Sequence, residues 1–511
     1  MRRILRFLLP LAALVIPTTS WEASTTANLA INVMVGQAIT AVKPGPSIAL
    51  YNSNPYYTCT NNRYVATIGN KTNNGTSPST PWDITTASNY AAPGGTCINV
   101  AAGTYNLPAN GGGTVQIRHG GTSSAVNGYV VWRCSTMPFS FSSGALQGEG
   151  TGCVITQAVG NNDYAVIAVN AGVSYVMFDA LEVGGTPANQ GVCIDDENSG
   201  SSSATSHHIW VFNSDMHNCG QSGLQLNYTD WLFLMNNVWH DNSFTNCDMG
   251  SGLSIYEPVG LSGYTPASGH NDYWYSNTTG LNYNMVLIYN VGYHNYNGAS
   301  CAPTTDGEGI LLDTFDHSSD ACPGVGVCPY NGNVLVMGNI MYYNGGGGLQ
   351  VFSWSSKLGH ATFVNNTAFD NYWDTHNTGT WRGNIFLNNA YNITFMNNIA
   401  YAYGTVNGTA NQPFVGNGDS GTTGNAWQTN VSYPGGLNNF GTGNTYPTSG
   451  TNHNLDGSNP LFVSVTPDST SNNFSLQSGS PAIGFGQAFD LWQQTGSVEA
   501  GACVSSLTTC P

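Results

Sequence analysis

The side chains best placed for chemistry are acids that follow one kind of short segment. Five segments begin with a glycine and continue with alternating apolar residues, at Gly191, Gly223, Gly252, Gly309 and Gly348. The fourth position after each glycine holds Asp195, Asn227, Tyr256, Asp313 and Phe352, and the fifth holds Asp196, Tyr228, Glu257, Thr314 and Ser353. If these segments stack as rungs about 4.8 Å apart, Glu257 and Asp313 lie roughly 5–7 Å apart on one edge.

Acids grouped in this way suit a hard cation such as Ca²⁺, which takes six to eight oxygen ligands. The candidate ligands are Asp306, Glu308, Asp313 and Asp316. The ion would neutralise a uronate carboxylate and acidify its α-proton, so that a basic side chain could start a β-elimination. The chain has three lysines, and two of them precede the repeats, which leaves Lys357 as the candidate base. Arg382 is the second choice for that role and otherwise a candidate for substrate binding.

Two other functions fit the same residues. Glu257 or Glu308 could work with Asp313 as the two carboxyl groups of a glycoside hydrolase, which suits a neutral glycan. Alternatively, the same surface could hold a glycan without cleaving it, as a non-catalytic cell-surface protein would. The aromatic residues Tyr273, Trp274 and Trp354 could stack on sugar rings in any of these cases, or could pin their own loops. Contact with Trp354 would help to lower the pKa of Lys357 by desolvation.

The elements that must position these residues are indicated by pairs of asparagines five residues apart. The pairs start at Asn213, Asn237, Asn290, Asn339 and Asn366, and a sixth copy keeps only Asn398. Each follows a short apolar run, and the shortest spacing fits one turn of a solenoid. A side-chain amide stacked on its copy in the next turn can donate to one neighbour and accept from the other. The repeats therefore predict a parallel β-helix.

Long connections leave this β-helix at neighbouring turns. After Ile255 the pattern resumes near Val286, and after Leu312 it resumes near Val334, whereas the other returns are short. Loops on one face of a repeat protein commonly form the binding face. We therefore expect long loops on one edge, beside the acidic residues.

Composition restricts the partners. The 511 residues include 27 Asp and Glu against 10 Lys and Arg, a net charge of −17, and only 7% of residues are charged. No basic patch suits nucleic acid, and no stretch after the N-terminus is long enough to span a membrane. We expect a monomer that binds a polysaccharide.

Targeting and cysteine usage point to an oxidising compartment. Arg2, Arg3 and Arg6 precede the apolar stretch 7–16, as in a signal peptide over about residues 1–30. The predicted organisation continues with an N-terminal extension (31–63), the β-helix (64–490) and a C-terminal tail (491–511). Twelve cysteines suit disulfides in a secreted or cell-surface protein. Plausible pairs are Cys134 with Cys153, Cys322 with Cys328, and Cys503 with Cys510.

The two ends of the repeat region resemble a known superfamily. The first part contains Tyr64–Thr67, Gly75–Thr76, Pro81–Trp82 and Gly103–Tyr105, and the last part contains Asn459–Phe462, Asn473–Leu476 and Ser480–Gly484. With the asparagine pairs, these segments resemble secreted right-handed parallel β-helix proteins, the superfamily that includes pectate lyases, from about Tyr64 to Gly486. The resemblance implies an all-β, single-stranded right-handed parallel β-helix. It also implies a polysaccharide lyase that uses Ca²⁺ and a Lys or Arg base.

Other polar residues have competing structural explanations. Asp195, Asp196 and Glu197 would form either a cation site about three turns from Asp313 or a solvated turn. His207, His208 and His240 lie in or beside strands, where a histidine is more often structural than a ligand. His270 and Asp272 lie in the first long loop and could join the site.

Overall fold

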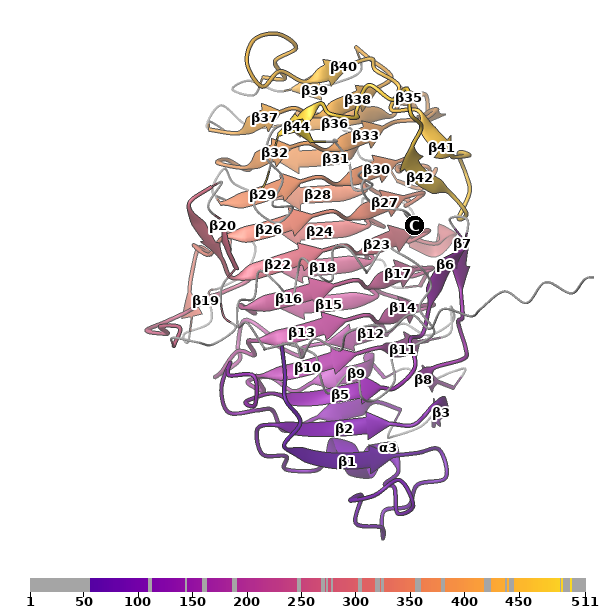
Figure 1. Cartoon of the computed structure of the whole chain (residues 1–511), viewed down its shortest axis with the longest axis vertical. Coiled ribbons are helices and arrows are strands. Elements are labelled where there is room, and N and C mark those ends of the chain that lie inside the picture. Colours follow the sequence, from indigo (N-terminus) through magenta and orange to yellow (C-terminus); the bar gives the residue numbers. More distant parts are fainter. Residues whose placement is uncertain are drawn as a thin grey trace, which may run out of the picture.

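A computed structural model describes the chain from residue 56 to residue 498. The exceptions are residues 109–112, 143–144, 159–162, 186–190, 246–249, 268–271, 273, 277–278, 302–305, 318–321, 323–325, 354–359, 378–381, 418–423, 437–438, 441–444, 488 and 490–496. The predicted signal peptide, most of the predicted extension and the Cys503–Cys510 pair lie outside these residues. The described chain forms a single-stranded right-handed parallel β-helix, as predicted (Figure 1).

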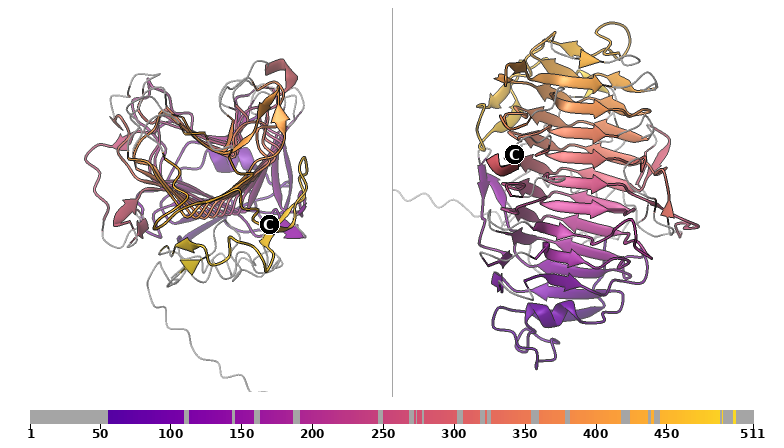
Figure 2. Two further views of the ribbon diagram at one scale, coloured as in Figure 1. Left: turned by 90° about the horizontal axis from the view of Figure 1, so that it is seen from above. Right: turned by 180° about the vertical axis from the view of Figure 1, so that it is seen from behind.

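Three parallel sheets run the length of the coil, and each turn contributes one strand to each sheet (Figures 1 and 2). Sheet A contains β1 (Asn61–Val65), β2 (Thr96–Val100), β5 (Val130–Cys134), β10 (Val176–Asp179), β13 (Ile209–Phe212), β16 (Leu232–Met235), β22 (Met285–Ile288), β26 (Val334–Met337), β29 (Ala361–Val364), β32 (Thr394–Met396) and β37 (Ala426–Gln428). Sheet B contains β3 (Gly103–Leu107), β8 (Cys153–Gln157), β11 (Leu181–Gly184), β14 (Asp215–His217), β17 (Val238–His240), β23 (Val291–Tyr293), β27 (Ile340–Tyr342), β30 (Thr367–Phe369), β33 (Ile399–Tyr401), β38 (Val431–Tyr433) and β40 (Leu455–Asp456).

Sheet C carries the glycine-led strands. Its order is β4 (Val115–Ile117), β9 (Ala165–Val169), β12 (Val192–Asp195), β15 (Leu224–Asn227), β18 (Leu253–Tyr256), β24 (Ile310–Asp313), β28 (Leu349–Phe352), β31 (Gly383–Asn388), β36 (Gln412–Asn417) and β39 (Asn439–Phe440). Alternate residues such as Leu253 and Ile255 point into the core and are fully buried. The intervening residues face outward, so the sheet presents a second set of side chains to whatever lies over it.

Short elements cap and decorate the coil. The helix α3 (Ile84–Ser88) begins after Asp83, whose side chain accepts a hydrogen bond from the Thr86 amide. The remaining elements are η1 (Ala299–Cys301) and the hairpins β6–β7 (Ser140–Ser142, Ala145–Gln147), β20–β21 (Trp274–Ser276, Leu281–Tyr283), β34–β35 (Thr405–Val406, Thr409–Ala410), β41–β42 (Phe462–Ser464, Asn473–Leu476) and β43–β44 (Gly486–Gln487, Ser497–Val498). None of the helices in the described residues has the length and hydropathy needed to cross a bilayer.

A two-residue turn joins sheet A to sheet B in most turns of the coil, and its second residue forms an asparagine ladder. In the middle of the ladder, Asn339 Nδ2 donates to Asn366 Oδ1 at 2.9 Å and to the Leu287 carbonyl at 3.0 Å. The Asn290 backbone and side-chain amides both donate to Asn339 Oδ1, at 2.9 Å each. The ladder begins at Asn237 and continues beyond Asn398 through Asn430 to Asn454. The predicted ladder is therefore confirmed and extended.

The second asparagine of each pair forms a parallel ladder from Asn242 through Asn295 and Asn344 to Asn371, which ends on Asn384. The first predicted pair is wrong, because Asn213 and Asn218 lie one residue before the ladder positions. Both adopt left-handed backbone conformations, with φ of 53° and 55°. Ser214 and Cys219 occupy the ladder positions instead, and their backbone amides donate to Asn237 and Asn242.

The long connections from sheet C to sheet A leave neighbouring turns, as predicted. They span residues 257–284 and 314–333, and they pair with each other through the antiparallel strands β19 (Gly260–Leu261) and β25 (Gly326–Val327). Longer connections also enter sheet C from sheet B, over residues 294–309 and 370–382. The expectation of long loops on one edge therefore holds for the longest pair, while the opposite edge of sheet C carries insertions as well.

Two disulfides link neighbouring turns of the coil, one joins two strands of a single turn, and one closes a loop within the second long insertion. The predicted pairs Cys134–Cys153 and Cys322–Cys328 are present. Cys59–Cys97 and Cys193–Cys219 are also bonded, and no cysteine in the described part of the chain is free. Disulfide bonding of this extent suits a protein that folds in an oxidising compartment.

Candidate functional site

An outward-facing column on sheet C contains a carboxyl group between two aromatic rings. Asp313 pairs with Tyr256 on one neighbouring strand and with Phe352 on the other. This pairing confirms the predicted alignment of these three residues. Tyr256 and Phe352 are partly exposed, whereas Asp313 is 8% exposed. Aromatic faces on both sides of a carboxyl group form a surface on which a sugar chain can lie.

The Asp313 carboxyl group is held in an environment that favours its neutral form. Burial, the largest cause, raises its pKa to about 7, and the nearby carboxylates of Asp306, Glu257 and Asp316 act in the same direction. Thr314 opposes the shift, because its hydroxyl donates to Asp313 Oδ1 at 2.6 Å. Asp313 can therefore carry a proton near neutral pH, as a general acid requires.

Glu257 approaches Asp313 from the preceding turn. Its backbone amide donates to the Asp313 carbonyl at 3.0 Å, and its carboxylate is one of those that raise the pKa of Asp313. Glu257 is fully buried, and its Oε2 lies 3.6 Å from His317 Nδ1. The backbone at Glu257 is left-handed, with φ of 45°, and Thr314 one turn away has the same conformation. The predicted proximity of Glu257 and Asp313 is thus present.

Asp306 and Glu308 precede the same strand as Asp313. Glu308 is fully buried, and Ser251 donates to its Oε2 at 2.8 Å. Burial raises the pKa of Glu308 well above its usual range, and Asp306 contributes to that shift. Asp306 raises the pKa of both Glu308 and Asp313, so its carboxylate is close enough to act on each of them. Asp316 is 7% exposed and lies just beyond the strand.

These acids match the donor chemistry of a calcium site. All four candidate ligands, Asp306, Glu308, Asp313 and Asp316, offer carboxylate oxygen, and Glu308 Oε1 is buried without a hydrogen bond among the described residues. Burial raises the pKa of Glu308 as well as that of Asp313, so by this criterion both carboxyl groups favour a proton over a metal ion. The donor type therefore suits Ca²⁺, but no three of these four carboxyl groups, all in the described part of the chain, bring their oxygens within 4.8 Å of one another.

Among the predicted basic and aromatic site residues, the structure describes only Arg382 and the backbone of Trp274. Arg382 is 2% exposed, its Nη2 donates to the Asn377 carbonyl at 2.8 Å, and burial lowers its pKa. It acts on the buried Tyr372 together with Glu308 and Asp306, which places it near those acids. Trp274 begins β20 and pairs with Tyr283. Lys357, Trp354 and Tyr273 lie outside the described residues, so their roles stay predictions.

The acidic group at Asp195 is buried, which excludes the solvated turn considered from the sequence. Asp195 and Asp196 are fully buried, and the Asn227 amide donates to both Asp196 oxygens at 3.0 Å. The predicted register is wrong here, because Asp195 pairs with Gln225 and not with Asn227. The pairing is shifted by two residues from the predicted one, and Glu197, just beyond the strand, has a left-handed backbone (φ 47°). The group lies three strands from β24, as predicted.

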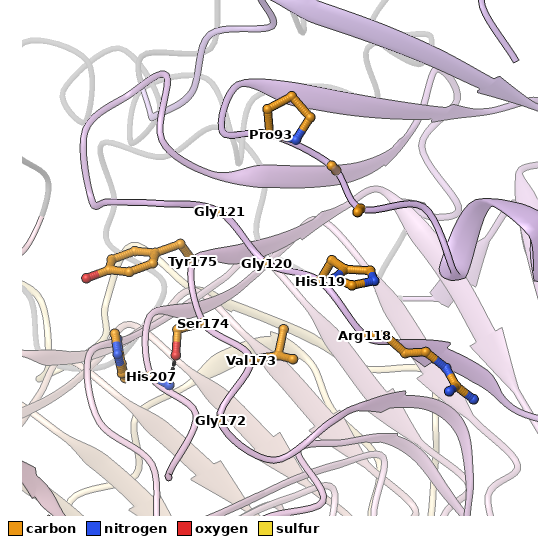
Figure 3. A pocket seen from close by; sticks show the side chains of 12 residues that line it. Pro93, Arg118, His119, Gly120, Gly121, Gly172, Val173, Ser174, Tyr175 and His207 are labelled. Atoms are coloured by element: carbon orange, nitrogen blue, oxygen red, sulfur yellow. Dashed lines mark hydrogen bonds between the residues drawn. The ribbon is translucent and has the colours of Figure 1, made fainter.

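A pocket at the N-terminal end of the same edge was not foreseen. Its volume is about 580 Å³, and its lining includes Arg118, His119, Ser174, Tyr175 and His207 (Figure 3). His207 Nδ1 lies 2.7 Å from His208 Nδ1, and burial lowers the pKa of His207 to about 3. The adjacent His207–His208 pair ahead of a strand was the only signal of it in the sequence.

A polar network connects this pocket to the first long insertion. His208 Nε2 lies 2.9 Å from Asp272 Oδ1, and the Tyr264 hydroxyl donates to the same oxygen at 2.9 Å. Asp272 therefore meets His208 and not the acidic cluster around Asp313. His270, predicted beside it, lies outside the described residues.

Comparisons with known proteins agree with the architecture. No protein-family profile matches the chain, and no curated protein matches it. Similar solved structures include a pectate lyase, Pel9A, at 18% identity and a TM-score of 0.49, with 87% of this chain and 96% of that chain covered. An alginate lyase from Paenibacillus sp. str. FPU-7 matches at 16% identity and a TM-score of 0.39, over 71% of this chain and 96% of that chain.

A GH136 lacto-N-biosidase from Eubacterium ramulus matches at 12% identity and a TM-score of 0.36, over 73% of this chain and 56% of that chain. Identities this low bear on the fold alone. The strand pairing establishes that fold by itself.

Proposed function

We propose that this protein is a secreted carbohydrate-active enzyme that cleaves an extracellular polysaccharide beside Asp313. The supporting observation is the column of Tyr256, Asp313 and Phe352, in which a carboxyl group with a raised pKa lies between partly exposed rings. The two longest insertions leave the same edge of sheet C and pair with each other. They can therefore form a wall along one side of a bound polysaccharide. Loops that flank one face of a β-helix are where such a ligand is expected.

In the proposed reaction, Asp313 gives its proton to the glycosidic oxygen that leaves. A carboxyl group can do this only in its neutral form, which its surroundings favour. The bond between the sugar carbon and that oxygen breaks, and the proton neutralises the departing oxygen. Asp313 then regains a proton from solvent before the next turnover. Tyr256 and Phe352 would hold sugar rings on either side, so that the scissile bond rests over Asp313.

The sugar carbon that loses the glycosidic oxygen can react in two ways. The first is β-elimination from a uronic acid residue. Lys357 would remove the proton at the carbon next to the uronate carboxylate, and the electron pair left behind would form the double bond as the glycosidic oxygen departs. Asp306, Glu308 and Asp316 would hold Ca²⁺, which supplies charge that neutralises the uronate. Arg382, buried near Asp306 and Glu308, would act on substrate only through a rearrangement of that region.

Glycoside hydrolysis is the second candidate. It is favoured by the presence of a second carboxylate, Glu257, close enough to raise the pKa of Asp313. Glycosidases use two carboxyl groups, one as the acid and the other as the base that activates water or as the nucleophile. This route needs neither Lys357 nor a metal ion.

A panel of polysaccharides assayed with and without a chelator tests the proposal. β-Elimination predicts products that absorb in the near ultraviolet and that disappear on chelation, whereas hydrolysis predicts new reducing ends without absorbance. Lys357→Ala should abolish elimination and leave hydrolysis intact, and Lys71→Ala is the matched control because Lys71 is exposed near the N-terminal cap. Full elimination activity in Lys357→Ala would exclude Lys357 as the base. A panel that yields neither product would leave only the glycan-binding alternative.

A further inference from the structure

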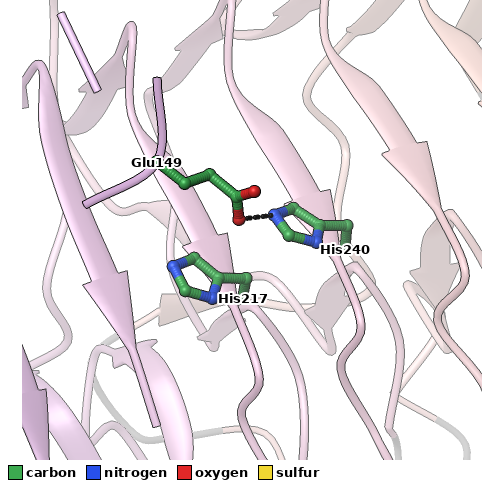
Figure 4. Close-up of side chains that lie close together, drawn as sticks. All are labelled: Glu149, His217 and His240. Carbon is green, nitrogen blue, oxygen red and sulfur yellow. Dashed lines mark ion pairs between the residues drawn. The ribbon is translucent and has the colours of Figure 1, made fainter. Parts of the chain in front are cut away.

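A cluster of histidines and carboxylates lies on the outer face of sheet B, away from the acidic cluster on sheet C. His217 ends β14, His240 ends β17, and Glu149 reaches them from the turn that follows β7 (Figure 4). Each of the three offers one ligand atom, and these atoms all lie within 4.8 Å of one another. The two imidazoles come from paired positions on neighbouring strands, so the coil itself sets their spacing.

The contacts within this cluster have the spacing of metal ligands. His240 Nε2 lies 3.2 Å from Glu149 Oε1 and 3.3 Å from Asp215 Oδ1, and it makes no hydrogen bond of acceptable geometry to either. A tetrahedral zinc ion with ligand bonds of about 2.0–2.2 Å separates its ligand atoms by roughly 3.3–3.5 Å. One N–H shared between two acceptors makes only a weak three-centre hydrogen bond, whereas a metal ion can bind all three atoms.

A buried carboxylate supplies a second and independent indication. Asp215 is fully buried, and neither of its oxygens has a hydrogen-bond partner, although Oδ1 faces His240 Nε2. A buried carboxylate without hydrogen bonds is costly unless a cation satisfies it. On the other side of the ring, His240 Nδ1 lies 2.6 Å from Asp241 Oδ2. Metal-bound histidines commonly make this contact through their second nitrogen, which orients the ring.

We propose that Glu149, His217 and His240 bind a divalent transition-metal ion, with zinc as the best match, and that Asp215 faces the same ion. Two imidazoles and carboxylates are a ligand set that zinc accepts, while calcium prefers oxygen alone. The rings of His217 and His240 stack 5.0 Å apart and 11° from parallel, so both must tilt their nitrogen edges toward a shared ion. His217 would exchange one of its present contacts for the ion, either Nε2 with Glu182 Oε1 at 3.3 Å or Nδ1 with Asn218 Nδ2 at 2.9 Å.

The proposed ion would fasten the segment after β7 to the coil. Glu149 is far along the chain from both histidines, and its side chain is 42% exposed, so it is the ligand that the fold holds least firmly. The Gly150 amide donates to Glu182 Oε2 at 2.8 Å, and His217 Nε2 lies 3.3 Å from Glu182 Oε1. The ion would therefore add a cross-link between the segment after the β6–β7 hairpin and strands β14 and β17. Such a cross-link stabilises the folded state by mass action.

Zinc binding by the full-length, tag-free protein tests the proposal after treatment with a chelator. Isothermal titration should give one zinc ion per chain, and Co²⁺ in its place should give the visible absorption of a tetrahedral site. Because His240 is buried, the variants are Glu149→Gln and His217→Ala, which alter the more exposed ligands. Each should weaken zinc binding by about tenfold or more. Zinc should raise the Tm of the wild type and have much less effect on Glu149→Gln.

Two controls separate this site from other sources of zinc binding. His453→Ala removes a histidine near the other end of the coil, whose Nδ1 lies 3.0 Å from the Gly450 carbonyl, and should bind zinc as the wild type does. Asp313→Asn should also keep the site, because the cluster on sheet C is separate. Absence of stoichiometric zinc in the wild type would overturn the proposal, and so would unchanged affinity in both Glu149→Gln and His217→Ala. Either result would mean that the cluster is an ion pair, in which a protonated His240 contacts the carboxylates without a metal ion.

Discussion

At the scale of single residues, buried carboxyl groups dominate the electrostatics of this protein. Burial raises the pKa of Asp179 to about 6 and those of Asp230 and Asp370 to about 7. Asp230 is buried, and its Oδ1 accepts hydrogen bonds from Asn284 Nδ2 at 2.6 Å and from the Tyr330 hydroxyl at 2.7 Å. Its hydrogen bonds tie the two long insertions to the coil, while its charge is unfavourable there.

The pH dependence of stability should follow from these groups. An aspartate with a folded pKa of about 7 holds a proton that the unfolded chain, with a pKa of about 3.9, has lost. Unfolding then releases a proton, so stability falls as pH rises from about 4 to about 7. Asp230→Asn keeps the Oδ1 acceptor and removes the charge. We predict that it stabilises the protein at about pH 8, by on the order of 2 kcal/mol, and has little effect at about pH 4.

Thermal unfolding across that pH range at constant ionic strength measures this effect. Asp456→Asn is the matched control, because Asp456 is exposed and its substitution should leave the slope unchanged. A variant at Asp230 with the same pH slope as the wild type would show that this carboxyl group titrates normally.

Residue types and spacing identified part of the site. Counting from the glycines aligned Tyr256, Asp313 and Phe352 because the three turns have equal strand lengths. The same count failed at Asp195, where the register shifts by two residues, because nothing in the local sequence marks the irregularity. Contacts such as His208 with Asp272 join residues 64 positions apart, and no periodicity predicts them.

At the scale of elements, the asparagine ladders define the turn between sheets A and B. Each ladder side chain uses its carbonyl and its amide in opposite directions along the coil, so one missing member leaves groups unpaired in both neighbouring turns. Asn339 is fully buried and has ladder neighbours on both sides, Asn290 and Asn366. Repeats contact only their neighbours, so damage at one rung weakens the coil locally.

Asn339→Ala should destabilise the fold by about 3 kcal/mol, because it leaves the backbone and side-chain amides of Asn290 without their acceptor. Denaturant unfolding followed by circular dichroism checks this. Asn282→Ala provides the comparison, since Asn282 is exposed on β21 and should change stability by less than about 0.5 kcal/mol. Equal effects of the two substitutions would mean that the ladder contributes nothing beyond its side-chain volume.

The repeating elements were predictable because the asparagine and glycine signals recur in successive turns of the middle of the coil. The prediction misplaced the ladder by one residue at Asn213. Asparagine suits both the left-handed turn position and the ladder position that follows it, and in this turn Asn213 occupies the first while Ser214 occupies the second. The pairing of β19 with β25 could not be predicted, because these two-residue strands lie in insertions without any repeat. The disulfide Cys193–Cys219 likewise depends on how two turns align in space.

At the scale of the whole molecule, the outer faces of the three sheets are used differently. The ring of Tyr56, near the start of the described chain, packs on Trp210, Phe212 and Phe233 of sheet A. The β41–β42 hairpin lies beside sheet B (Figure 1). Its Phe462 and Phe474 pack on Phe369, which belongs to an outward column of aromatic residues on that sheet. The chain's own end segments therefore cover parts of these two faces.

Sheet C differs because insertions border it on both edges, and its outward residues include the acids around Asp313. The net charge of −17 would repel a polyanionic glycan unless a cation accompanied it. A neutral glycan would meet no such barrier. The choice between β-elimination and hydrolysis thus depends on the charge of the substrate as much as on the residues that act on it.

The most direct test of this account is the turnover of a cleavable polysaccharide by Asp313→Asn, measured through near-ultraviolet absorbance and reducing ends together. Asparagine cannot donate the proton that the proposed reaction requires, so the account predicts a loss of at least about a hundredfold in kcat with Tm preserved. Asp456→Asn should retain wild-type turnover. Wild-type turnover by Asp313→Asn would contradict the account and move the active site away from the column on sheet C.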